Sequence, residues 1–133
     1  MFPRVAVVIF VLLLLTIATI GVIAAVRFKR SEDIAKCQRV ASDSSAYRTF
    51  LEEYHTMNGF FPTTHQGLRA LVEKPTSSPV PVDWRQIAGD VVSDPWGMPY
   101  IYRSPGIRHP DEYDFFSAGP DRKPDTADDV WRE

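Results

Sequence analysis

The residue types best suited to chemistry gather near the C-terminus, in the segment SAGPDRKPDTADDV (117–130). Four aspartates, Asp121, Asp125, Asp128 and Asp129, fall within nine positions of it, among glycine, proline and serine. Such a segment disfavours helix and strand, and its unpaired carboxylates would repel one another. Ca²⁺ would relieve that repulsion, because it takes about six to eight oxygen ligands in flexible geometry. The spacing does not match an EF-hand, so composition leaves two alternatives, a calcium loop or a solvated acidic segment.

Other chemistry-bearing residues are scattered along the chain. Asp94, Asp111 and His109 are suited to acid–base catalysis, but no motif brings them together. The single cysteine, Cys37, excludes an internal disulfide and a cysteine-built zinc site, and we expect it to be packed or to face lipid. A net charge of −2 and a pI of about 5.9 lack the basic excess of nucleic-acid-binding proteins. An enzyme and a nucleic-acid-binding protein are both disfavoured.

The N-terminal part contains an unbroken apolar run, Val5 to Val26. As a helix this run would be roughly 33 Å long, which is about the thickness of a bilayer core. A retained membrane helix fits best. The alternative, a cleaved signal peptide, has a shorter apolar core and a small-residue cleavage site, whereas this run ends at Arg27, Lys29 and Arg30. A lipoprotein anchor is excluded because Cys37 follows a charged segment.

The charges around the run bear on its orientation. Arg4 precedes it, and Arg27, Lys29 and Arg30 follow it. The positive-inside rule therefore leans weakly toward a cytoplasmic C-terminal part.

Beyond the run, apolar residues continue at spacings of three or four, which is typical of an amphipathic helix. They are Ile34, Cys37, Val40 or Ala41, Tyr47, Phe50 or Leu51, Tyr54 and Met57. No proline intervenes before Pro62, and Asn58-Gly59 is a C-terminal stop signal. We predict a single helix from about residue 4 to 58, with two helices and a hinge near residues 29–33 as the alternative.

After this helix the pattern predicts a small α+β domain. Thr63 and Gln66 have capping-box spacing for a short helix through Glu73. The segments Met98–Arg103 and Tyr113–Ala118 are rich in aromatic and β-branched residues, which favours two antiparallel strands packed on the long helix. We expect five aromatic side chains in the core: Trp84, Trp96, Tyr100, Phe115 and Phe116.

The order of several motifs resembles one known family. FPTTHQGLRALVEKP, DPWGMPYIYRSPG, EYDFFSAGPD and ADDVW occur between residues 58 and 131, as in the major pseudopilins of type II secretion systems (general secretion pathway protein G). The resemblance implies a transmembrane helix half (1–30) and a pseudopilin-like periplasmic domain (31–133). Within that domain it implies a helix continuation (31–58), a loop region with a short helix (59–97), and a β-sheet with a calcium loop (98–133).

The resemblance also implies a set of calcium ligands. They are the backbone carbonyls of Ala118 and Pro120 and the carboxylates of Asp121, Asp128 and Asp129. The family often has glycine after the first aspartate, where this chain has Arg122. Asp125 is an extra carboxylate that either binds the ion or faces water.

The N-terminal residues depart from the family pattern. The resemblance implies a basic leader, a Gly-Phe cleavage site for prepilin peptidase, and a glutamate at the fifth mature position. Here no glycine precedes Gly21, the fifth residue counted from Phe2 is Ala6, and the first acidic residue is Glu32. Either the chain is an unprocessed pseudopilin-like protein, or its N-terminus differs from the usual precursor.

Two functions follow from the resemblance. In the first, the chain is a non-enzymatic, single-pass subunit of the inner membrane, with its C-terminal domain in the periplasm. It polymerises with itself and with minor pseudopilins, contacts inner-membrane secretion components, and forms the pseudopilus that drives export of folded proteins. In the alternative, it is a signal-anchored, calcium-stabilised interaction module that does not polymerise.

Overall fold

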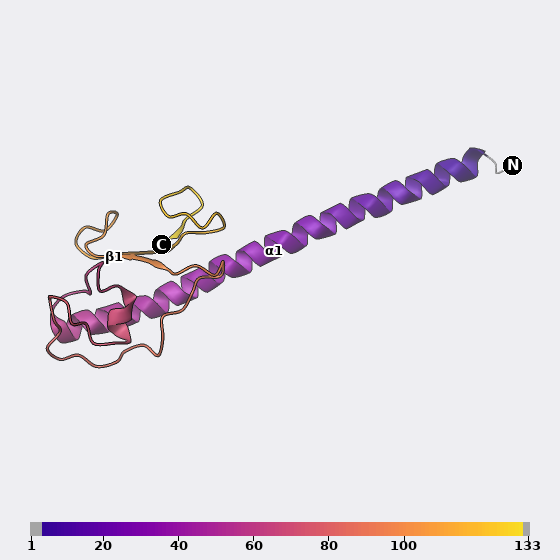
Figure 1. Cartoon of the computed structure of the whole chain (residues 1–133). Helices are drawn as coiled ribbons and strands as arrows, with labels where there is room; N and C mark the ends of the chain where they lie inside the picture. The colour runs from indigo at the N-terminus through magenta and orange to yellow at the C-terminus, as the bar shows by residue number, and fades with distance from the viewer. Residues whose placement is uncertain (1–3, 132–133) are drawn as a thin grey trace. The chain divides into compact units, whose positions relative to one another are not determined.

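The N-terminal part of the chain forms one helix. The computed structural model describes residues 4–131 apart from the side chain of Val5, so the processing position at Phe2 lies outside the described residues. Helix α1 extends over Arg4–Asn58 (Figure 1), which confirms the single helix rather than two helices with a hinge. Gly59 ends it in the left-handed region, at φ 79°, and its N–H donates to the carbonyl of His55 at 2.7 Å.

The chain divides into two compact units, Met1–Lys36 and Cys37–Glu133. In the first unit the apolar side chains of α1 are exposed to a large extent, for example 61% for Phe10 and 68% for Phe28.

In the second unit, one face of α1 is buried. Burial recurs at spacings of four and three residues, at Val40, Ser44, Tyr47, Leu51 and Tyr54. This confirms the amphipathic pattern from Val40 onward. The pattern was wrong for Ile34 and Cys37, which are exposed, because apolar spacing does not tell where the covering segments begin.

The loop region contains a short helical turn, η1 (Leu68–Leu71). Thr63 and Gln66 make the reciprocal hydrogen bonds of the predicted capping box: the Thr63 N–H donates to Gln66 Oε1 at 3.0 Å, and the Gln66 N–H donates to Thr63 Oγ1 at 3.2 Å. They close the turn before η1, whose own N-cap residue, Gly67, has no side-chain cap. The helical turn η1 is of 3₁₀ type and ends before the predicted Glu73. Gly67 at φ 59° opens the turn and Pro75 follows it, which leaves too little chain for an α-helix.

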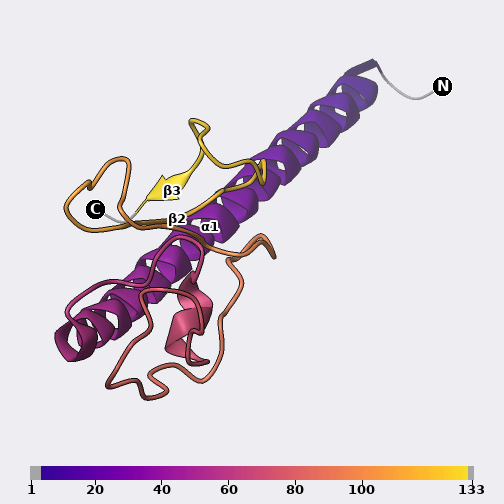
Figure 2. The ribbon, with the colours of Figure 1, turned by 60° about the vertical axis from the view of Figure 1, so that its left-hand side comes forward.

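A three-stranded antiparallel sheet completes the second unit. Its strands are β1 (Ile101–Arg103), β2 (Asp114–Ser117) and β3 (Val130–Trp131), in the order β1-β2-β3. The first two are shorter than predicted, and β3 was not predicted because two residues show no alternation. Figure 2 shows the sheet and η1 lying alongside the C-terminal half of α1.

Aromatic side chains join the sheet to α1. The ring of Tyr47 lies 5.0 Å from that of Phe115 and 6.1 Å from that of Tyr100. Tyr100, Phe115 and Phe116 are buried, and Trp84 and Trp96 pack partly buried against the core. The expectation of a core position is therefore confirmed for Tyr100, Phe115 and Phe116, whereas Trp84 and Trp96 lie at the edge of the core.

Two buried aspartates organise the connections. Asp94 accepts hydrogen bonds from the N–H groups of Trp96 and Met98 and from the Ser117 hydroxyl. Asp114 has no exposed surface, and it accepts three backbone N–H bonds from residues 107–109 and pairs with His109 Nδ1 at 3.0 Å. Asp94 and His109 are thus engaged in separate hydrogen-bond networks.

Asp114→Asn should change how stability depends on pH. Burial raises the pKa of Asp114, but the hydrogen bonds from residues 107–109 outweigh it and leave this pKa below its usual range. The stabilisation is therefore present above the unfolded pKa, about 3.9, and is lost as pH falls through the folded value. The variant should be less stable at pH 7 and should lose less stability on acidification. Urea unfolding of the full chain in detergent, followed by tryptophan fluorescence, measures both.

Asp111→Asn is the matched control, since Asp111 is an exposed acid in the same connection. If the free energy of unfolding of Asp114→Asn fell as steeply with decreasing pH as that of the wild type, this role for Asp114 would be contradicted.

Candidate metal site

The acidic segment forms the loop between β2 and β3, drawn in yellow in Figure 1. Its carboxylates accept hydrogen bonds from within the loop. The Asp121 N–H donates to Asp128 Oδ2 at 3.0 Å, the Thr126 hydroxyl donates to Asp128 Oδ1 at 2.7 Å, and the Lys123 N–H donates to Asp121 Oδ1 at 2.8 Å. The loop therefore closes on itself through its own aspartates.

The five predicted ligands occupy different environments. Ala118 is buried directly after β2, Pro120 and Asp121 are exposed, and Asp128 and Asp129 are half-buried directly before β3. The hydrogen bond from Asp121 to Asp128 brings these two residues together. Asp129 is held separately, because its Oδ2 accepts the Asp125 N–H at 2.9 Å.

Two backbone positions shape the loop. Gly119 has φ 66°, and a Cβ atom placed there would lie 2.2 Å from the carbonyl oxygen of Asp128. Only glycine permits this close approach of the two loop ends. Arg122, which stands where the family often has glycine, has φ 62°, so it adopts the left-handed conformation that glycine favours.

The carboxylate of Asp125 is largely exposed, and it pairs with an arginine from outside the loop. It forms two hydrogen bonds with Arg103 at the end of β1, Nη1 to Oδ1 at 2.8 Å and Nη2 to Oδ2 at 2.7 Å. The hydrogen bond from Arg103, and to a smaller extent the positive charge of Arg103, hold the pKa of Asp125 below its usual range.

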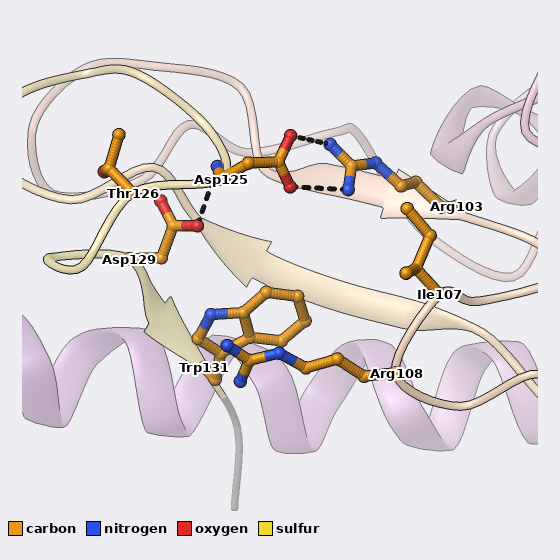
Figure 3. A pocket seen from close by; sticks show the side chains of 7 residues that line it. All are labelled: Arg103, Ile107, Arg108, Asp125, Thr126, Asp129 and Trp131. Atoms are coloured by element: carbon orange, nitrogen blue, oxygen red, sulfur yellow. Dashed lines mark hydrogen bonds and ion pairs between the residues drawn. The ribbon is translucent and has the colours of Figure 1, made fainter.

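A surface cavity of ≈ 240 Å³ adjoins the loop and includes Asp125, Thr126 and Asp129 in its wall (Figure 3). On its other side the Arg108 guanidinium lies 3.7 Å from the centre of the Trp131 ring, which stacks on Phe116 at 3.9 Å. Sequence reasoning missed Arg103, Arg108 and Trp131. No short-range signal marks them, because β3 and the turn after β1 bring them together.

The donor atoms of the loop suit a hard cation. All the predicted ligand atoms are oxygens, as Ca²⁺ prefers. Hydrogen bonds from Thr126 and then from the Asp121 N–H hold the pKa of Asp128 below its usual range. Within residues 4–131, Asp129 Oδ1 is buried and has no hydrogen-bond partner, a condition that a bound cation would relieve.

The loop is not closed around a metal position, however. Among the described residues, no three acidic, histidine or cysteine side chains converge closely enough to hold a metal ion. The donors therefore fit calcium in type, and binding would require the carboxylates of Asp121 and Asp128 to turn toward that of Asp129.

Comparison with solved structures defines the class of protein. The chain is similar to the major pseudopilin from the type 2 secretion system of enterohaemorrhagic Escherichia coli, with a TM-score of 0.70 and 43% sequence identity. The match covers 75% of this chain and 84% of that one. The fold, a long helix with a small antiparallel sheet, is thus that of a pseudopilin.

Sequence comparisons identify the family. The family model for type II secretion system protein G matches residues 27–132. The type II secretion system core protein G of Dickeya chrysanthemi is 39% identical, covering 89% of this chain and 79% of the relative. The protein of the same name from Pseudomonas aeruginosa is 34% identical, covering 87% and 84%. The chain belongs to the type II secretion system protein G family, the major pseudopilins.

Gly119→Ala should destabilise the C-terminal unit more than Gly59→Ala does. Both glycines have positive φ, so each alanine should cost about 1–2 kcal/mol from backbone strain alone. Only at Gly119 would the new Cβ also collide with a backbone carbonyl, which should bring the total to about 3 kcal/mol or more. Urea unfolding in detergent compares them, and equal losses would contradict the close approach of Gly119 and Asp128.

Proposed function

We propose that this protein is a structural, non-enzymatic subunit of a type II secretion pseudopilus. It would be held in the inner membrane by its single apolar helix, with the Cys37–Glu133 unit in the periplasm. Its partners would be further copies of itself, minor pseudopilins and inner-membrane secretion components. The pseudopilus would drive export of folded proteins.

The observation that carries this proposal is the exposed apolar surface of α1 in the first unit. The helix is long and apolar enough to cross a membrane. From Val7 to Phe28 its large apolar side chains are about half exposed or more, so the free energy of the chain favours covering them with lipid or with other helices. In a membrane, packing between such helices holds subunits together.

The family membership supports the same proposal, since the relatives carry the name core protein G. The periplasmic placement of the C-terminal unit rests on the family. The charges of Arg27, Lys29 and Arg30 after the apolar run act against it only weakly.

Photo-crosslinking through α1 tests polymerisation. With a photoreactive amino acid in place of Ile17, in membranes of a type II-secreting bacterium, illumination should give a ladder of dimers, trimers and longer products. The side chain of Ile17 is exposed on the apolar helix, so a neighbouring helix would contact it.

The same photoreactive residue in place of Glu73 controls for random collision, because Glu73 is exposed on the C-terminal unit and collisions would link both positions equally. One defined band with a different protein would favour the non-polymerising interaction module. An unlinked monomer would contradict the filament.

We further propose that the loop binds Ca²⁺ through the carbonyls of Ala118 and Pro120 and the carboxylates of Asp121, Asp128 and Asp129. The ion would stabilise the loop by offsetting the repulsion among these carboxylates. Its chemistry is structural, because its binding free energy adds to the stability of the folded state.

Calcium should raise the unfolding temperature of the full chain in detergent. At about one hundred times the dissociation constant, the gain in stability should be about 2.7 kcal/mol. Asp121→Ala and Asp128→Ala should each abolish it, whereas the exposed Asp111→Ala should retain it. Mg²⁺ should give a smaller effect, since it demands tighter octahedral geometry. An unchanged melting curve in saturating CaCl₂ would overturn the calcium site.

A further inference from the structure

Arg103 connects the sheet to the acidic loop. It is the last residue of β1, and its two guanidinium nitrogens hold both carboxylate oxygens of Asp125, at 2.8 and 2.7 Å (Figure 3). The Arg103 side chain is 22% exposed, so it is fixed by its surroundings, whereas that of Asp125 is 60% exposed. Two parallel N–H···O bonds set the plane of a carboxylate as well as its position. Arg103 therefore holds Asp125 from a rigid element.

Asp125 in turn holds Asp129. The backbone of Asp125 is in the left-handed region, at φ 69°. Its N–H donates a hydrogen bond to Asp129 Oδ2 at 2.9 Å. One oxygen of Asp129 is thereby used, and the other, Oδ1, is the buried oxygen without a hydrogen-bond partner within the described residues. Asp125 therefore links the two residues, because its side chain pairs with Arg103 and its backbone N–H donates to the Asp129 carboxylate.

We propose that Arg103 is a positioning residue for calcium, which acts through Asp125 to present Asp129 Oδ1 to the ion. This inference rests on the calcium site proposed above. Arg103 does not touch the ion. It lowers the cost of ordering the loop, as groups that hydrogen-bond to metal ligands do in general.

Charge and geometry make opposite predictions for Arg103. As a nearby positive charge it would repel Ca²⁺, so its removal would strengthen binding if charge dominated. Its removal would also strengthen binding if Asp125 were itself a ligand, since that carboxylate would be released. A positioning role predicts that removal of Arg103 weakens calcium binding, because loss of the ion pair leaves Asp125 and Asp129 without a fixed orientation.

Calcium titration of the full chain in detergent, by isothermal calorimetry with CaCl₂, distinguishes these cases. Arg103→Met, which removes the charge, and Arg103→Lys, which keeps the charge but loses the two-pronged contact, should both weaken calcium binding about tenfold or more. Asp125→Asn should do the same. Arg108→Lys is the matched control, because Arg108 lines the same cavity but contacts Trp131; it should bind calcium as the wild type does.

Tryptophan fluorescence in EGTA establishes that each variant is folded before titration, and Arg103→Lys is the variant that disturbs the fold least. Wild-type affinity in both Arg103 variants, or tighter binding in Arg103→Met, would overturn the positioning role while leaving the calcium site intact. Absence of calcium binding by the wild-type chain would overturn the site itself, and the positioning role with it.

Discussion

The contact on which the second unit depends is that between the buried face of α1 and the aromatic residues of the sheet. Tyr47 is its centre, since its ring contacts Phe115 and Tyr100, and its hydroxyl accepts the Val92 N–H at 3.0 Å. The three strands have only three, four and two residues, and so small a sheet is not stable alone. Burial of these rings against a helix supplies the apolar area that the sheet lacks. The acidic loop joins β2 to β3, so it begins and ends on the sheet that this contact stabilises.

Buried carboxylates then fix the connections. Asp94 and Asp114 are nearly or fully buried, and each accepts backbone N–H donors from the connection next to it. Asp94 also accepts the hydroxyl of Ser117 in β2. A buried carboxylate is costly unless such donors surround it. These two aspartates therefore hold in place loops that lie outside regular secondary structure.

The negative charges of the acidic loop are stabilised in two ways. Backbone amides and the Thr126 hydroxyl bind Asp121 and Asp128, while Arg103 neutralises Asp125. Asp129 retains one oxygen without a hydrogen-bond partner among the described residues. The proposed roles are divided: the apolar half of α1 anchors and packs, and the loop stiffens the domain.

The sequence by itself determined the local and periodic features. An apolar run without proline, followed by spacings of three and four residues, specified α1, and the Asn58-Gly59 stop signal specified its last residue. Thr63 and Gln66 specified their capping box, because both partners lie within one turn. Only the tertiary structure decided that β3 pairs with β2, that Cys37 is exposed, and that Arg103 forms an ion pair with Asp125. Strand pairing and ion pairs across 22 positions leave no periodic signal in a sequence. They arise when α1 and the sheet pack together and bring distant residues within reach.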